Sequence, residues 1–302
     1  MSTFYQLETD FRYVNCGMCW VLLLDDGTLV VEDGGFFAPG QAEALHDFFA
    51  SVCPGGIRIR AWLFSHAHQD HIGAFINYVR MYPDTEIDEV RYSFQPCDFT
   101  GVDEFWQDSD PATFREFYTV LRELPPSTRI LSLETGDVLK YGEAEIEVLY
   151  TYKDAKEPIT NFNDNSAVLM LKVKGTRFFL PGDAAKVAAL SLLEKPEKLV
   201  CDFTQVAHHG FNGLPSEVYA ANKAAYSVWP MPHYEWDRNL PRPANTFVAG
   251  NTKVITCADG TLEIPLPFAG EYRVLPRMFP EADENNPLYI TAKITNPVLK
   301  FS

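Results

Sequence analysis

The stretch His66-Ala67-His68-Gln69-Asp70-His71 decides how this chain is interpreted. It follows the apolar run Ala61-Trp62-Leu63-Phe64, which predicts a buried strand over residues 57–64. Three imidazoles and a carboxylate on so short a loop are costly to bury unless they have partners. Imidazole and carboxylate together are typical zinc ligands, with manganese and iron as alternatives. The stretch therefore predicts a metal site formed by His66, His68, Asp70 and His71.

The spacing of these residues indicates two ions rather than one. His66 and His68 alternate along a chain that leaves a strand, so both can point to one side. Asp70 and His71 lie at the turn into a helix expected over residues 72–81, and they can face a second ion. A two-metal site needs further ligands, including one that bridges the ions.

Two strand ends in the second half of the chain supply candidates for these further ligands. A strand over residues 176–180 leads to Pro181-Gly182-Asp183, and a strand over 199–207 ends at His208-His209-Gly210. Ligands bind at the carboxyl ends of strands in open α/β sheets. We expect Asp183 to bridge the two ions, with a helix N-cap as its alternative role. Either His208 or His209, and only one of them, is expected to complete the second site.

The pattern of apolar runs predicts an α/β fold with four layers. Hairpins are expected at residues 20–31 and 166–180, since short apolar runs are joined there by Asp-Gly and Lys-Gly turns. Apolar residues at helical spacing alternate with further strands. This alternation predicts two mixed β-sheets packed face to face with outer helices. Helices are expected at residues 41–51, 72–81, 111–124, 184–194 and 215–223, and a last strand near 288–294.

Composition limits the partners of the chain. Its 302 residues include 41 acidic and 25 basic side chains, for a formal net charge of −16. This balance disfavours binding to long nucleic acid, which needs cationic contacts, but does not exclude a small phosphate ester held by metal ions. No run approaches the roughly 20 apolar residues of a membrane span. Without a secretory signal pattern at the N-terminus, and with cysteines expected to be reduced, we expect a cytoplasmic protein. The sequence makes no prediction about oligomeric state.

The stretch from His66 to His71 also matches the HxHxDH signature of metallo-β-lactamase-fold hydrolases. Asp33-Gly34-Gly35, Pro181-Gly182-Asp183 and Ala207-His208-His209-Gly210 follow in the order typical of that superfamily. Among its members the chain resembles the ComEC-type and choline-phosphate-esterase-like branch. In that branch an Asn-x-Ser-containing strand, here residues 163–169, recurs together with a Gly-Asp turn and a His-His-Gly motif. The resemblance covers about residues 12–256. It implies an αββα sandwich and a metal-dependent hydrolase, with 257–302 as a C-terminal extension of a single domain over 1–302.

The chain departs from the family pattern at one ligand. Many binuclear members place another histidine between the signature and the bridging aspartate, but no histidine occurs here between His71 and His208. In the segment 160–166, Asn161, Asn163 or Asp164 would be a weaker ligand, or a water would replace it. The first ion is therefore expected to bind loosely. The flavodiiron branch places Glu at the position of His68, so oxygen reduction is disfavoured.

The expected reaction is hydrolysis of a small ester. Bound metal lowers the pKa of water to about 7 and so supplies a hydroxide nucleophile near neutral pH. Asp70 would both bind metal and hold the nucleophile. His233 would donate to developing negative charge or to the leaving group, with a plain surface position as the alternative. Phosphodiesters and phosphoryl esters are favoured over lactones and amides. The alternatives are a non-catalytic module with one structural or sensory ion, and, less favoured, a nuclease.

Aromatic and acidic residues gather in two segments that would border a substrate. The aromatic ones would form a pocket wall suited to an apolar or quaternary-ammonium group, or else belong to the core. The acidic ones would repel polyanions and tolerate a cationic substrate. The aromatic residues are Phe94, Phe99, Phe105, Trp106, Tyr234 and Trp236, and the acidic ones are Asp98, Asp103, Glu104, Asp108 and Asp110.

Overall fold

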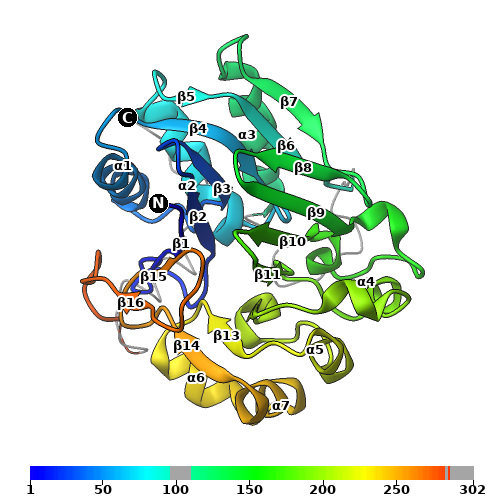
Figure 1. The fold of residues 1–302 in the computed structure, drawn as a ribbon. Coiled ribbons are helices and arrows are strands. Elements are labelled where there is room, and N and C mark those ends of the chain that lie inside the picture. The colour runs from blue at the N-terminus through cyan, green and yellow to red at the C-terminus, as the bar shows by residue number, and fades with distance from the viewer. Residues whose placement is uncertain (96–109, 283–284, 286–302) are drawn as a thin grey trace.

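The structure, a computed structural model, describes residues 1–95, 110–282 and 285. Two mixed β-sheets lie face to face with helices on their outer faces (Figure 1). This arrangement confirms the predicted four-layer α/β sandwich.

The first sheet contains most of the N-terminal strands. Its order is β16-β15-β1-β2-β3-β4-β6-β7, and β5 pairs with β4. Pairing is antiparallel from β16 to β3 and parallel from β3 to β7, so the sheet is mixed. The strands are β1 (Thr3–Gln6), β2 (Cys19–Leu23), β3 (Leu29–Asp33), β4 (Arg58–Leu63), β5 (Glu86–Ile87), β6 (Glu89–Tyr92), β7 (Arg129–Ser132), β15 (Leu262–Pro265) and β16 (Arg273–Val274).

The second sheet has the order β14-β13-β12-β11-β10-β9-β8. It is antiparallel from β8 to β11 and parallel from β11 to β14. The strands are β8 (Val138–Tyr141), β9 (Ala144–Tyr150), β10 (Val168–Val173), β11 (Thr176–Leu180), β12 (Phe203–Gln205), β13 (Tyr226–Trp229) and β14 (Lys253–Thr256). Both predicted hairpins, β2–β3 and β10–β11, are present.

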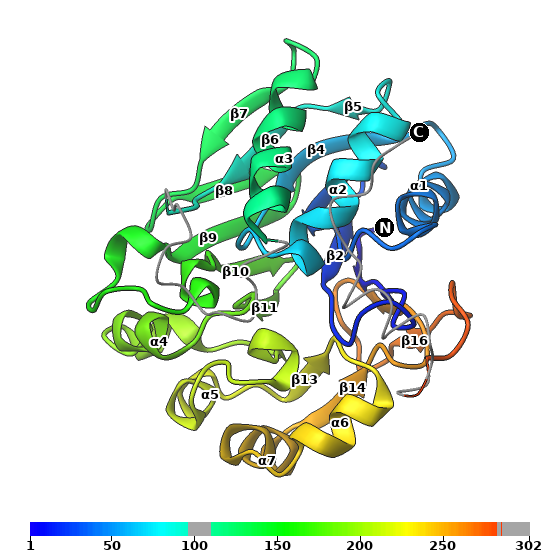
Figure 2. The ribbon, with the colours of Figure 1, turned by 180° about the vertical axis from the view of Figure 1, so that it is seen from behind.

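Alternate side chains of each strand supply two different cores, because successive residues point to opposite faces of a sheet. Between the sheets, residues such as Phe4 and Phe178 meet with ring centroids 4.3 Å apart. The outer face of the first sheet is covered by α1 (Gln41–Val52), α2 (Gln69–Met81) and α3 (Asp110–Glu123) (Figure 2). The outer face of the second sheet is covered by α4 (Lys186–Leu192), α5 (Ser216–Asn222), and α7 (Pro243–Asn251), with α6 (His233–Asn239) beside them.

Several elements differ from the sequence expectations. Helix α2 begins at Gln69, three residues before the predicted start, so Asp70 and His71 lie in its first turn. Helices α6 and α7 were not predicted. Strand β15, from the segment expected to be an extension, pairs with β1 inside the first sheet. The strand expected near residues 288–294 lies outside the described part of the chain. None of the helices described here is long and apolar enough to cross a membrane.

Candidate metal centre

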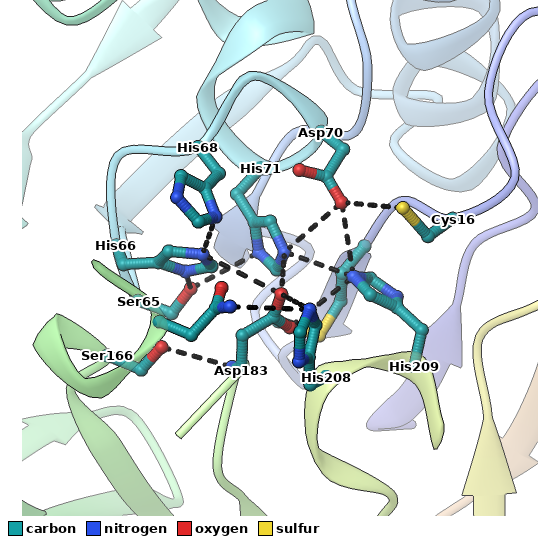
Figure 3. A network of polar contacts seen from close by, with 12 residues as sticks. Cys16, Ser65, His66, His68, Asp70, His71, Ser166, Asp183, His208 and His209 are labelled. Atoms are coloured by element: carbon teal, nitrogen blue, oxygen red, sulfur yellow. Dashed lines mark hydrogen bonds and ion pairs between the residues drawn. The ribbon is translucent and has the colours of Figure 1, made fainter. Parts of the chain in front are cut away.

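The polar residues that the sequence singled out come from three chain segments that follow strand ends. After β4, residues 65–68 lead into α2, and after β11 the chain turns at Pro181-Gly182-Asp183. After β12, His208 and His209 lie in a short 3₁₀ turn, Ala207–Gly210. Since β4 and β12 lie in different sheets, the sandwich brings the ends of both sheets to one place (Figure 3).

Four buried side chains form one donor set, here named the second set: Asp70, His71, Asp183 and His209. One ligand atom from each lies within 4.8 Å of the others. His209 Nε2 is 3.2 Å from Asp70 Oδ2 and 3.3 Å from Asp183 Oδ1. His71 Nε2 is 3.3 Å from Asp183 Oδ2. Two carboxylates and two imidazoles converging on one point have the chemistry of a zinc, iron or manganese site.

Three side chains form the first set: His66, His68 and Asp183. His66 Nε2 lies 3.0 Å from His68 Nδ1 and 3.7 Å from Asp183 Oδ2. Asp183 is thus common to both sets, the arrangement that a bridging carboxylate requires. Its Oδ1 atom is buried, and its one polar neighbour among the described contacts, His209 Nε2 at 3.3 Å, makes no well-formed hydrogen bond to it. Burying an unsatisfied carboxylate oxygen is costly, so the donors present fit divalent cations.

Residues outside the two sets hold the imidazoles in place. Asp33 is the last residue of β3, and its Oδ2 atom lies 2.7 Å from His71 Nδ1. The same carboxylate accepts hydrogen bonds from the backbone N–H and the hydroxyl of Ser65. His209 Nδ1 is 3.1 Å from the carbonyl oxygen of Pro230. When Nδ1 donates to such acceptors, Nε2 keeps its lone pair for a metal. Asp33 was not expected in the site, although the sequence contains the Asp33-Gly34-Gly35 turn.

The turn that contains His208 and His209 has an unusual backbone. Both residues have positive φ, 52° and 51°, in the left-handed region that non-glycine residues rarely adopt. The turn is anchored by the backbone N–H of His208, which donates to the carbonyl oxygen of Gly182. As a result the two neighbouring imidazoles separate. His209 joins the second set, whereas His208 Nε2 lies 3.9 Å from Asp183 Oδ2 and 3.3 Å from Asn163 Nδ2. The His208 side chain is 20% exposed, so it faces the solvent side of the cluster.

The segment expected to replace the missing histidine does not place Asp164 in either donor set. Asp164 Oδ1 accepts hydrogen bonds from the backbone N–H groups of Ala185 and Ala188, at the start of α4. Asn161 accepts a hydrogen bond from the backbone N–H of Asn163. Of the three candidate substitutes, Asn163 is the one whose side chain lies beside His208.

His233 lies apart from the cluster. It is the first residue of α6, and its side chain is 52% exposed. Its Nε2 lies 2.9 Å from Asp259 Oδ1. The structure therefore places it in a surface pair rather than among the metal-binding residue types.

The carboxylates divide the histidines into two electrostatic classes. Burial lowers the pKa of His66 well below its usual range, and lowers the pKa of His68 to about 4. Burial also opposes a charge on His71 and His209, but the Asp183 and Asp70 carboxylates outweigh it. They raise the pKa of His71 and raise that of His209 to about 9. Burial lowers the pKa of His208, so this imidazole is neutral near pH 7.

The aromatic residues are divided between core and site. Phe94 is buried in the core under α3, and Trp236 packs on Trp229 with ring centroids 4.5 Å apart, so both follow the core alternative. Beside the cluster lie Phe162, 5.3 Å from the His68 ring, and Phe211, 5.6 Å from the His208 ring. The Tyr234 ring contacts the Arg238 guanidinium. Phe99, Phe105, Trp106, Asp98, Asp103, Glu104, Asp108 and the Asp110 side chain lie outside the described residues.

Comparisons with known structures agree with this fold. The metallo-beta-lactamase fold protein YhfI from Bacillus subtilis matches with a TM-score of 0.53 at 12% identity, over 87% of this chain and 100% of its own. A diphosphatase from the PhnP family matches with a TM-score of 0.50 at 15% identity, over 89% and 99%. CmlA, a diiron beta-hydroxylase from Streptomyces venezuelae, matches with a TM-score of 0.52 at 12% identity, over 88% of this chain and 54% of its own. At these identities the likeness shows the fold alone.

Comparison with curated protein sequences finds no significant match. The family model described as "Metallo-beta-lactamase superfamily" matches residues 14–213, about two thirds of the chain, and this span includes every residue of the two donor sets. The chain belongs to the metallo-beta-lactamase superfamily.

Proposed function

We propose that this chain is a binuclear metal-dependent hydrolase of small esters. The observation that carries the proposal is the Asp183 carboxylate, which belongs to both donor sets and lies 3.3 Å from His71 and His209 and 3.7 Å from His66. A buried carboxylate shared in this way is suited to bridge two cations. A single structural ion would need only one of the two sets.

Each proposed ion has its own residues. His66, His68 and Asp183 would hold the first, and Asp70, His71, His209 and Asp183 would hold the second. Zinc fits these donors, with manganese and iron as alternatives. When bound, two such ions supply Lewis-acid chemistry, which acidifies a water and polarises the ester under attack.

Two residues of the chain would act on the water and the substrate. Asp70 is a candidate to hold the attacking water as well as a metal. His208, neutral and partly exposed beside Asp183, would donate a hydrogen bond to an ester oxygen. His233 and Asp164 take no part in this proposal, because they bond to Asp259 and to the start of α4.

Phosphodiesters and phosphoryl esters are our first choice of substrate. Two-metal sites suit in-line displacement at phosphorus, where attacking and leaving oxygens both gain negative charge. The resemblance to the ComEC-type and choline-phosphate-esterase-like branch supports the same choice. The net charge of −16 supports a small ester over long nucleic acid, since a polyanion would be repelled.

The test combines metal analysis with kinetics. Protein stripped by a chelator is reloaded with zinc, manganese or iron, its metal content is measured, and hydrolysis of bis-p-nitrophenyl phosphate is compared with that of a lactone and a β-lactam. We expect two ions per chain and phosphodiester hydrolysis that His68→Ala and Asp183→Asn abolish. The control is His233→Ala, an exposed histidine that should leave the rate unchanged. Absence of metal, or full activity of His68→Ala, would overturn the proposal.

A second candidate function rests on the small size of the first set. Among the residues that the structure describes, three donors form it, and the segment 160–166 contains no histidine. A chain that keeps only the second ion would be a metal-binding module without turnover. One tightly bound ion together with no hydrolysis of phosphate, lactone or β-lactam substrates would favour this candidate.

A further inference from the structure

Cys16 contacts the cluster from a segment that the HxHxDH signature does not include. Its Sγ atom lies 3.1 Å from Asp70 Oδ2, and the residue is 6% exposed. Figure 3 shows the thiol pointing at the Asp70 carboxylate from the side away from His66 and His68. The Cys16 sulfur therefore faces an oxygen of a proposed metal ligand.

The chain on both sides of Cys16 is held in place. The backbone N–H of Met18 donates to the Asp70 carbonyl oxygen at 3.1 Å, which ties this segment to the first turn of α2. Gly17 packs so closely on Thr9 that a Cβ atom there would lie 2.7 Å from Thr9 Cγ2, so a larger residue would force the Thr9 side chain to move. Asn15 Nδ2 donates to Glu235 Oε1 at 3.0 Å. The thiol therefore meets Asp70 through a constrained backbone and not through a mobile loop.

The oxygen that Cys16 contacts is the one that faces the second set. Asp70 Oδ2 lies 3.2 Å from His209 Nε2 and 3.6 Å from His71 Nε2. The Cys16 sulfur is not among the four donor atoms that lie within 4.8 Å of one another in the described chain. The sulfur thus contacts a ligand oxygen from outside the set. A thiol is a weak donor, and a carboxylate is its best acceptor.

We propose that Cys16 is a positioning residue for the second ion, whose thiol donates a hydrogen bond to Asp70 Oδ2 and fixes that carboxylate toward His209. The inference rests on the proposed function only in taking Asp70 as a ligand. Removing a group that orients a metal ligand in this way lowers the metal affinity about 10- to 100-fold. The expected effect is confined to one ion, because Cys16 contacts Asp70 and Asp70 belongs to the second set alone.

Cobalt titration of the metal-free full chain tests the proposal, since the visible absorption of Co²⁺ reports each binding event and its geometry. Cys16→Ala and Cys16→Val both remove the donor, and valine keeps more of the side-chain volume. We expect the second-set affinity to fall about tenfold in both, with the other binding event unchanged. Cys16→Ser keeps a donor and should restore most of the affinity. The matched control is Cys53→Ala, which removes an equally buried thiol at the end of α1.

Several outcomes would overturn the positioning role. Equal affinities in wild type, Cys16→Ala and Cys16→Val would do so. A near-ultraviolet thiolate-to-cobalt charge-transfer band that disappears only in the Cys16 variants would show direct ligation instead. Thermal unfolding of each metal-free variant identifies any loss of folding, and comparison of alanine with valine separates packing from hydrogen bonding. Failure of wild type to bind cobalt would reject the metal site itself, whereas failure of the variants to differ would reject only the role of Cys16.

Discussion

Loading the metal-free protein should release protons from one donor set and not from the other. A histidine must lose its proton from the coordinating nitrogen before it binds metal. At pH 7 His209 is protonated, because its pKa is raised to about 9. The pKa of His71 is raised as well, but its Nε2 lies 3.2 Å from His209 Nε2, so a proton on one nitrogen opposes a proton on the other. His66 and His68 are already neutral, because burial lowers both pKa values. Filling the second set should therefore release between one and two protons, and filling the first set about none.

The structure also sets the size of the pH effect on affinity. Each pKa unit corresponds to 1.36 kcal/mol, so removing the proton of His209 at pH 7, two units below its pKa, costs about 2.7 kcal/mol. That cost weakens the apparent affinity of the second ion about a hundredfold at pH 7. It disappears as the pH rises through about 9, because the free protein then no longer holds the proton. The first ion should show no such dependence over this range.

Isothermal titration calorimetry in two buffers of different ionisation enthalpy counts the released protons. We expect between one and two protons with the second-set event at pH 7, and weaker binding of that ion in His209→Ala. His233→Ala, which alters an exposed histidine, should match wild type. Metal binding without proton release, or release that accompanies the first set, would refute this account of the cluster.

Three further predictions concern other residues. His209→Ala should bind one ion more weakly than wild type, whereas His208→Ala should keep both ions and lower kcat by about a hundredfold. Metal analysis with steady-state kinetics distinguishes the two variants. Gly73→Ala should lower the free energy of unfolding by about 1–3 kcal/mol in urea titrations, because a Cβ there would lie 2.8 Å from the backbone nitrogen of Phe37. Unchanged stability would contradict that close approach. Burial raises the pKa of Glu8 to about 7, so the folded state keeps a proton that the unfolded state loses above about 4.5. Stability should therefore fall by up to about 3 kcal/mol between these pH values, and Glu8→Gln should abolish that loss, as pH-dependent chemical unfolding would show.

Much of the fold was predictable because local signals agreed with the tertiary structure. The Asp-Gly turn before β3 and the Lys-Gly turn before β11 both close real hairpins. The apolar spacing of α1 was sufficient to place it within one residue at its end. Helices α6 and α7 were missed because prolines at positions 230, 232, 241 and 243 suggest a loop in that region. Pro243 at the start of α7 was the available signal, since proline is favoured in the first helical turn.

The sequence by itself determined the chemical character of the site. Three histidines and one aspartate within six residues, followed much later by Asp183 and the histidine pair, predict a metal-dependent chemistry from residue types alone. That inference needed no tertiary contact, because few other uses compensate for burying so many imidazoles and carboxylates.

Only the tertiary structure decided how these residues are arranged. His208 and His209 are chemically identical neighbours, and their different roles follow from two positive φ angles and an anchor on Gly182. Asp33 and Cys16 reach the cluster from segments more than thirty residues away in the chain. Such contacts depend on how two sheets pack and on where each side chain points after its strand ends, and neither is encoded in local spacing.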